Sequence, residues 1–466
     1  MREIFIYSSL AIAFLAPAKA EPPNFADHVL PIFKENCLSC HDEGKKKGGL
    51  VLSSLEKVLE GSSGGQVVKP GVADSSVLLM AIRHEEGVKA MPEDEAKLSD
   101  ANIKVISDWI DGGLLNVAGG KSLLREVDSD VELVGGVRRP ADPAFPKNLP
   151  PLSEAEIVRP LPVMALASSP WANLFAVNGY ERIDLYGVGE RESEYRHLGA
   201  LPFPEDEIHD LRFSRDGELL VAAGGVGSES GYAVVFEVRT GKRIARLGDE
   251  KDVALSADIS ANNQFVAIGT PKKMVKIMSV QDGRVLHEIK KHTDWVTRVR
   301  FSPDGKWLAT GDRNGGIHIW ETKTGGIVYT LAEHKMAITA LGWRPDGKML
   351  VSGAEDGKMI LWDMKDGFPV RSANTHALKS ESRFTRHTGV LDIAMSGEGI
   401  FLTTGRDRTL KRWKPDGGGH GAINDLENLP TRLVLSQEGQ AAITGDSNGK
   451  LTVWDLKTLK SIQKLP

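Results

Sequence analysis

Hydrophobic and polar positions follow two different periods along this chain of 466 residues. Apolar residues recur every three or four positions in segments 25–33 and 99–110, which predicts amphipathic helices. From about residue 157 they alternate with polar residues in short runs between Asp-Gly turns, which predicts β-hairpins. The pattern predicts a multidomain protein, with an all-α domain at 21–116, a linker at 117–156 and an all-β domain at 157–466.

The β region repeats itself. The segments FSPDG at 301–305 and WRPDG at 343–347 lie 42 residues apart, and FSRDG at 213–217 is a third copy. Each repeat contains a strand that closes on a large apolar residue, and these closing residues are Tyr186, Phe236, Met278, Trp320, Trp362, Trp413 and Trp454. Seven repeats of four strands predict a seven-bladed β-propeller.

The Trp-Asp pairs Trp362-Asp363 and Trp454-Asp455 carry a further signal. With the repeat length, they make this half of the chain resemble a WD-repeat propeller. The resemblance implies a rigid module whose faces bind other proteins. Whether a strand near Ile157 and Val158 locks the ring stays open at this point.

Several propeller histidines fall where WD repeats place a structural hydrogen-bonded group. The expected sets are His334, Ser352, Asp356 and Trp362 in blade five, and His387, Thr404, Asp407 and Trp413 in blade six. Blade four has His292, Thr310 and Trp320, with Asn314 at the Asp position. Because this spacing fits blade packing, we interpret these histidines as structural residues and not as metal ligands.

The first 20 residues form a separate segment. Arg2 precedes an apolar run at 4–15, and Ala18-Lys19-Ala20 has the small-x-small form of a signal-peptidase site. The run is shorter than the roughly 20 residues that cross a bilayer, so we predict a cleaved signal peptide and a periplasmic or other extracytoplasmic protein without a membrane span. A net charge of −5 makes nucleic acid an unlikely partner.

The two cysteines carry the most specific chemistry. Cys37-Leu38-Ser39-Cys40-His41 is C-x-x-C-H, in which two thiols bind haem covalently and the histidine ligates the iron. The alternatives are one disulfide or a redox-active dithiol. A redox dithiol needs a preceding strand, whereas the segment before Cys37 has helical spacing. The motif therefore predicts one covalent haem c, with His41 as proximal ligand.

An electron carrier also needs a second axial ligand. Met91 is the main candidate, because Met91-Pro92 lies in a polar loop before a helix that Ser99 caps. Met80 and His84 are the alternatives, although Met80 fits core packing and His84 fits a solvated surface. We expect Met91 to be the distal ligand.

The region from Phe25 to Leu114 resembles the small cytochrome c domains of planctomycetes and related bacteria. The features that carry the resemblance are Pro31-Ile32-Phe33 before the C-x-x-C-H motif, Gly48-Gly49-Leu50-Val51-Leu52 after it, the Met91-Pro92 loop, and Ile106-Ser107-Asp108-Trp109-Ile110 before Gly112-Gly113. The resemblance implies a haem c domain whose distal ligand comes from the Met-Pro loop.

Two insertions interrupt the propeller repeats, at 225–232 and at 374–386. The second carries His376, Lys379, Arg383 and Arg386, a locally basic loop in an acidic protein. It is either an ordinary solvated loop or a docking site for an acidic partner.

Three functions are compatible with these patterns. The first is electron transfer through a His/Met-ligated haem, with redox partner proteins and with the propeller as docking module. The second is a redox enzyme subunit, by analogy with nitrite reductases that join a cytochrome c domain to a propeller. The third is a cell-envelope scaffold with a structural or sensory haem. Because no nucleophile or hydrolase motif is present, we expect a carrier and not a catalyst.

Overall fold

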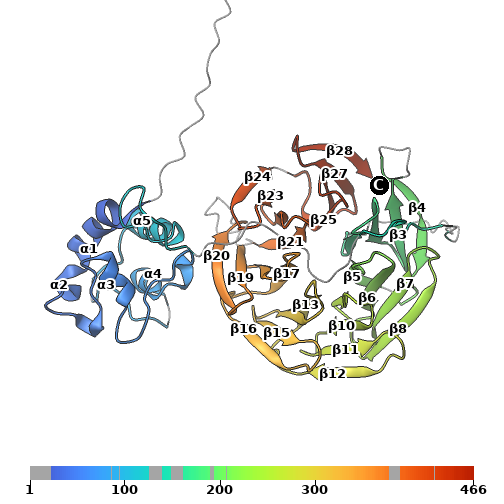
Figure 1. The fold of residues 1–466 in the computed structure, drawn as a ribbon, viewed down its shortest axis with the longest axis horizontal. Coiled ribbons are helices and arrows are strands. Elements are labelled where there is room, and N and C mark those ends of the chain that lie inside the picture. The colour runs from blue at the N-terminus through green and yellow to red at the C-terminus, as the bar shows by residue number, and fades with distance from the viewer. Residues whose placement is uncertain are drawn as a thin grey trace, which may run out of the picture. The chain divides into compact units, whose positions relative to one another are not determined.

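The computed structural model divides into two compact units, with the division between Leu124 and Arg125 (Figure 1). It describes residues 23–85, 87–93, 95–124, 139–147, 149, 161–188, 194–205, 207–376, 389–424 and 426–465. The predicted signal peptide, the possible strand near Ile157 and Val158 and much of the predicted linker lie outside the described residues.

The first unit consists of short helices joined by loops. They are the π-helix η1 (Phe25–Val29), α1 (Leu30–Asn36), α2 (Leu38–His41), the 3-10 helix η2 (Lys47–Gly49), α3 (Leu55–Glu60), the 3-10 helix η3 (Ala73–Ser75), α4 (Val77–Ile82) and α5 (Asp100–Asp111). The described residues of this unit contain no strand, only an isolated bridge between Ser62 and Gly65. Across the described parts of the chain, no helix has the length and apolar character needed to span a membrane.

The longest helix, α5, organises the core of this unit. It begins after the predicted cap Ser99, whose Oγ accepts a hydrogen bond from the Asn102 N–H at 3.2 Å. Trp109 is fully buried, its ring centre lies 5.6 Å from that of Phe25, and its indole N–H donates to the Leu115 carbonyl. The large apolar surface of Trp109 is thus buried while its polar atom remains satisfied.

The second unit is a ring of seven four-stranded antiparallel sheets, which confirms the predicted seven-bladed propeller (Figure 1). Blade one comprises β1 (Leu166–Ser168), β2 (Leu174–Asn178), β3 (Arg182–Gly187) and β4 (Arg196–Pro202). Blade two comprises β5 (Glu207–Phe213), β6 (Leu219–Gly225), β7 (Gly231–Glu237) and β8 (Arg243–Glu250). Blade three comprises β9 (Ser256–Ile259), β10 (Phe265–Gly269), β11 (Val275–Ser279) and β12 (Val285–Ile289).

The remaining four blades repeat this order. Blade four comprises β13 (Val296–Phe301), β14 (Trp307–Asp312), β15 (Ile317–Glu321) and β16 (Ile327–Leu331). Blade five comprises β17 (Ile338–Trp343), β18 (Met349–Ala354), β19 (Lys358–Asp363) and β20 (Phe368–Asn374). Blade six comprises β21 (Val390–Met395), β22 (Phe401–Gly405), β23 (Leu410–Trp413) and β24 (Gly419–Ile423). Blade seven comprises β25 (Pro430–Leu435), β26 (Ala441–Asp446), β27 (Leu451–Asp455) and β28 (Lys460–Leu465).

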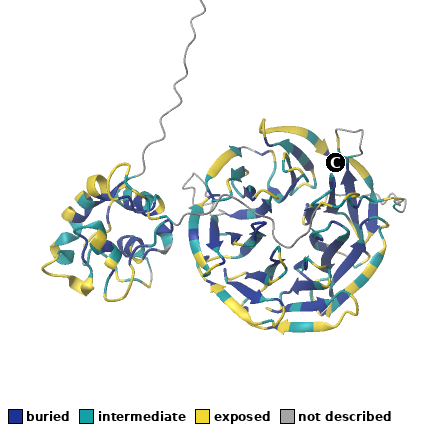
Figure 2. Ribbon diagram, in the orientation of Figure 1, coloured by how far each residue is buried: buried dark blue, intermediate teal, exposed yellow. Residues whose placement is uncertain are grey.

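Burial changes from the inside of the ring to its rim. Figure 2 shows buried residues along the inner strands of the blades and exposed residues on the outermost ones. The second strand of blade five, β18, is buried at every position, whereas the outer strand β16 exposes Ile327 and Val328. The inner strands therefore form the packed core between blades, and the outer strands face solvent.

The predicted closing residues occupy one equivalent position in all seven blades. Each lies on the third strand, where the pairing with the fourth strand shifts register, as between Leu361 and Trp362 in blade five. Such a bulge bends the strand and increases its twist. In every blade, the large side chain thus lies at the bulge where the third strand shifts its pairing with the outer strand.

The repeated Asp-Gly turns have a common local structure. In blade four, the Ser302 hydroxyl donates to the Asp304 carboxylate at 2.6 Å and accepts from the Trp307 N–H at 2.9 Å. Gly305 completes the turn with φ of 70°, a conformation that favours glycine. These requirements explain the recurrence of Ser, Asp and Gly in the repeats.

Blade one closes the ring by packing directly against blade seven. All four strands of each blade are consecutive in the chain, so no strand is exchanged between the ends within the described residues. The Thr431 hydroxyl donates to the Val163 carbonyl at 2.6 Å, and Gln463 exchanges two hydrogen bonds with the backbone of Tyr195. Within the described residues, blades one and seven meet through side-by-side contacts, and the possible strand near Ile157 and Val158 lies outside them.

Part of the segment expected to be a linker also packs against the propeller. Ala144 is buried in the cluster shared by blades one and two, and Phe145 and Leu149 lie against it. The Lys147 N–H donates to the Arg239 carbonyl at 2.9 Å. These residues therefore contribute to the propeller core.

The predicted hydrogen-bonded set of blade five is confirmed. The Trp362 indole N–H donates to Ser352 Oγ at 2.8 Å, which lies 2.8 Å from His334 Nε2. His334 Nδ1 lies 3.0 Å from the Asp356 carboxylate, which only accepts hydrogen bonds when ionised. The imidazole therefore carries its proton on Nδ1, and its Nε2 accepts from Ser352.

The expected set of blade four needs one correction. Asn314 does not leave His292 without a carboxylate, because Asp312, two residues earlier, lies 2.9 Å from its Nδ1. Asp312 is the last residue of β14, and its other oxygen accepts from the backbone N–H groups of Asn314 and Gly316. The carboxylate of Asp312, at the end of the strand, thus replaces the one expected in the turn at position 314.

The expected set of blade six was wrong in two members. Thr403, not Thr404, accepts from the Trp413 indole N–H at 3.0 Å, and it lies 2.8 Å from Nε2 of His376. His376 Nδ1 lies 2.8 Å from Asp407, as predicted for His387, which falls outside the described residues. Most of the insertion at 374–386 follows His376 and does not precede it. The histidine is therefore farther from the second strand of its blade than in blades four and five.

Candidate functional site

The C-x-x-C-H motif forms a single helical turn. Helix α1 ends at Asn36, and Cys37 is the N-cap of the short helix α2, with its carbonyl accepting from the N–H groups of Cys40 and His41 at 3.1 and 3.0 Å. Both thiols are half-buried and are not joined in a disulfide. The turn therefore presents two free thiols and one imidazole from neighbouring positions.

A hydrogen bond orients the imidazole of His41. Its Nδ1 lies 3.4 Å from the Leu50 carbonyl, which can only accept, so Nδ1 carries the proton. Nε2 keeps its lone pair and is available to a metal ion. The His41 carbonyl in turn accepts from the Leu52 N–H at 2.9 Å, which ties this segment to the motif.

These side chains line a cavity of about 570 Å³. Four of its lining residues are Cys37, Cys40, His41 and Met91, so the structure brings all the predicted site residues to one place. The apolar part of its wall consists of Leu50, Leu52, Val67, Val77, Leu78, Ala81, Ile82, Val88 and Pro92. Two thiols, an imidazole and a thioether around an apolar space are the donor set and surroundings that a covalent haem requires.

Two hydrogen bonds to the backbone of Met91 hold this residue at the cavity. The Met91 N–H donates to the Ala81 carbonyl in α4 at 3.0 Å, and His84 Nε2 lies 3.2 Å from the Met91 carbonyl, to which it donates. His84 thus supports the loop, and neither His84 nor Met80 lines the cavity. Of the three candidate distal ligands, the structure places only Met91 beside the motif within the described residues.

Three charged side chains connect the two edges of the cavity. Lys47, in η2, and Lys89, in the Met91 loop, lie 2.6 and 2.5 Å from the carboxylate of Glu93. Hydrogen bonds from Lys47 and Lys89 lower the pKa of Glu93 to about 2, although the group is exposed. Sequence reasoning missed this contact, because Lys47 and Glu93 belong to no shared motif or period.

Burial raises the pKa of the Cys37 thiol to about 11. Reactive dithiols instead have lowered thiol pKa values, which supply the nucleophilic thiolate at neutral pH. The surroundings of Cys37 therefore argue against the redox-dithiol alternative. Elsewhere in the described parts of the chain, no three His, Cys, Asp or Glu side chains gather in a group that could hold a metal ion.

Comparisons with known families agree with both units. Residues 37–95 match the family model described as Planctomycete cytochrome C, a match that spans Cys37, Cys40, His41 and Met91. Residues 241–395 match the Vps8 beta-propeller model, and residues 378–414 match the WD domain, G-beta repeat. Comparison with curated proteins gave no match. The chain therefore combines a cytochrome c-like region with a WD-type propeller.

Proposed function

We propose that this chain is an extracytoplasmic mono-haem c-type cytochrome that transfers electrons, with its propeller as the docking module. The observation that carries this proposal is the shared cavity of Cys37, Cys40, His41 and Met91. Residues 1–20, with the features of a signal peptide, would export the chain to the compartment where such proteins mature. The all-α cytochrome c fold is part of the proposal.

Each of the four site residues has one role in the proposed haem site. The Cys37 and Cys40 thiols would form the two thioether bonds, and His41 would ligate the iron through Nε2 while its Nδ1–H stays on the Leu50 carbonyl. Met91 would supply a second ligand to the iron through its thioether sulfur. The chemistry that such a group supplies is one-electron transfer at iron.

The rest of the cavity controls access to that group. The apolar part of the wall would limit the contact of water with the bound group, which favours a higher reduction potential. The Lys47, Lys89 and Glu93 contacts hold the Met91 loop beside the segment that follows His41. Because these ion pairs are exposed, they add little to stability. The propeller supplies rigid faces for redox partners and other envelope proteins.

Expression with a cytochrome c maturation system tests this function. We expect one covalent haem per chain, retained after denaturation and reducible in a potentiometric titration followed optically. A Cys37→Ala, Cys40→Ala double variant should lose covalent haem, while Ser39→Ala, which keeps both thiols, should retain it. Purified wild-type protein without covalent haem would contradict the proposal, and a second chromophore would favour the redox-enzyme alternative.

A further inference from the structure

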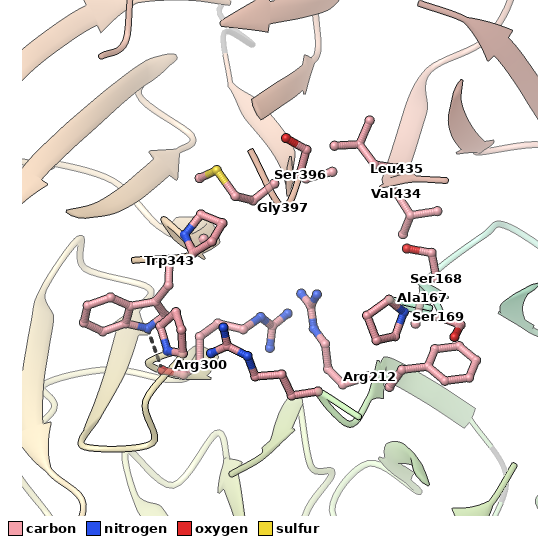
Figure 3. A pocket seen from close by; sticks show the side chains of 18 of the residues that line it. Ala167, Ser168, Ser169, Arg212, Arg300, Trp343, Ser396, Gly397, Val434 and Leu435 are labelled. Atoms are coloured by element: carbon pink, nitrogen blue, oxygen red, sulfur yellow. Dashed lines mark hydrogen bonds between the residues drawn. The ribbon is translucent and has the colours of Figure 1, made fainter. Parts of the chain in front are cut away.

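The propeller has its own cavity, of about 570 Å³, at the end of the central channel where the Asp-Gly turns meet (Figure 3). It is lined from the innermost strands of all seven blades, β1, β5, β9, β13, β17, β21 and β25. The proposed function of the first unit makes no use of this space.

The cavity arises from the size of the side chains at one equivalent position on these strands. The penultimate residues of the seven inner strands are Ala167, Arg212, Asp258, Arg300, Gly342, Ala394 and Val434, and all of them line it. Four are small or apolar, which leaves room at this level of the channel. The long side chains come from blades two and four, and Figure 3 shows Arg212 and Arg300 directed into that room.

The arginines of this cavity keep donors without protein partners. Arg300 is only 8% exposed and donates through Nη1 to Asp210 and Ser256, yet its Nε has no acceptor in the described parts of the chain. The same holds for Nε of Arg212 and Nη1 of Arg215. Buried donors without partners are costly, and all three arginines also line the open space, so their combined positive charge indicates a site for an anion.

Two of the nearby carboxylates, those of Asp258 and Asp210, are already occupied by other donors. Asp258 accepts from the N–H groups of Ile259 and Phe301 at 3.0 and 2.7 Å, and burial raises its pKa. Asp210 is held by Arg300 and by the Ser256 hydroxyl, and its closest oxygen lies 3.8 Å from Arg212 Nε. Burial and the adjacent Arg300 charge lower the pKa of Arg212. An anion would relieve this repulsion between like charges.

The remaining wall is largely apolar. Phe213, Ile259, Phe301 and Trp343 line the same space, and the Trp343 indole N–H is already used by the Arg300 carbonyl at 3.0 Å. A ligand that fits both parts of the wall has an oxyanion for the guanidinium groups and an apolar body for the rings. A carboxylate is planar and matches the paired donors of a guanidinium group.

We propose that this end of the channel binds a small carboxylate that carries an apolar or aromatic body. The proposal does not depend on the haem of the first unit. Arg212 and Arg215 would bind the carboxylate, and Arg300, fixed by Asp210 and Ser256, would add its positive charge. The aromatic side chains would contact the body of the ligand.

Calorimetric titration of the full-length protein with benzoate tests the proposal directly. We expect saturable binding of benzoate and no binding of benzamide, which has the same ring without the charge. Acetate and inorganic phosphate should bind at least 10-fold more weakly, because they lack the apolar body. Equal affinity for benzoate and benzamide, or for benzoate and acetate, would overturn this assignment.

Matched variants separate the site from general charge effects. Arg212→Gln and Arg215→Gln should each weaken benzoate binding at least 10-fold, which corresponds to about 1.4 kcal/mol. Arg313→Gln is the control, because this exposed arginine stacks on Trp295 and does not line the cavity. Without ligand, Arg212→Gln should also unfold at the same or a higher temperature than wild type, since it removes charge repulsion. Unchanged binding in both cavity variants would refute the proposal.

Discussion

At the scale of single residues, the cytochrome-like cavity depends on side chains that come from separate segments of the first unit. His41 follows α1 and is oriented by Leu50, while Met91 is held by Ala81 and by His84. The C-x-x-C-H motif is local, so its sequence alone predicts the haem attachment that we propose. The Met91 loop reaches the same space only through tertiary contacts.

Replacing Met91 tests its role as distal ligand. In the haem-loaded protein, Met91→Ala should lower the reduction potential by on the order of 100 mV, because methionine ligation raises it. The reduced variant should also bind carbon monoxide, since one axial position becomes open. Met80→Ala is the matched control, because Met80 does not line the cavity. Carbon monoxide binding to the Met80 variant alone would assign the ligand to Met80.

Adjacent threonines in blade six offer a second test at this scale. Thr403 accepts from Trp413 and contacts His376, whereas the hydroxyl of buried Thr404 has no partner in the described residues. Thr403→Val should therefore destabilise the propeller by about 2 kcal/mol, because it leaves the buried His376 imidazole and the half-buried Trp413 indole N–H without this partner. Thr404→Val should be neutral or stabilising. Denaturant unfolding measures both, and the reverse order would restore the set first expected from the sequence.

At the scale of elements, the repeats show which features a sequence pattern can predict. The closing residues, the Asp-Gly turns and the seven blades were predictable, because strand alternation and turn chemistry recur at a nearly constant spacing. The set of blade six was missed because an insertion separates His376 from its strand. The interval of ten residues from Thr310 to Trp320, and again from Ser352 to Trp362, would have selected Thr403.

The arginine cavity was also missed, although the sequence held a signal for it. Arg212-Phe213-Ser214 and Arg300-Phe301-Ser302 occupy the same position in blades two and four. Two arginines before equivalent turns must approach the same end of the channel. Which of their N–H donors find acceptors, however, depends on Asp210, Ser256 and the other blades, which only the closed ring brings together.

His318 in β15 makes blade four sensitive to acid. Its ring packs against His292 and Trp320, and burial together with the charge of His292 lowers its pKa to about 4. The unfolded state, with a histidine pKa near 6.5, therefore binds more protons than the folded state between pH 4 and about 6.5. The contribution of this residue to stability is complete above pH 6.5 and decreases as the pH falls to 4.

Replacement by the residue at the same register in blade five tests this effect. His318 pairs with Thr310 as Ile360 pairs with Ser352, so His318→Ile fits the strand. When the pH falls from 7.5 to 5, the free energy of unfolding of the variant should rise by roughly 2 kcal/mol relative to that of the wild type. Denaturant unfolding at the two pH values measures the difference. An equal change in both proteins would show that His318 does not titrate in this range.

At the scale of the whole molecule, the two units have separate cores. The first is one cluster around Phe33, Ile106 and Trp109, and the second is a series of clusters between neighbouring blades. Contacts such as that between Thr431 and Val163 join the first and last blades, and among the described strands none is exchanged between them. Each blade is thus stabilised mainly by its neighbours, whereas the first unit depends on its own small core.

This difference predicts two unfolding transitions in calorimetry. A small domain buries a lower fraction of its surface than a large one, so a covalent group whose packing and iron ligation exist only in the folded state contributes much of its stability. The Cys37→Ala, Cys40→Ala variant, which should lack haem, should therefore show one transition lowered by about 10 °C or more and the other unchanged. Benzoate should raise the temperature of the propeller transition only, which loss of haem leaves unchanged. The proposed benzoate site lies wholly within the propeller. A single transition, or equal shifts of both, would mean that the two units do not unfold independently.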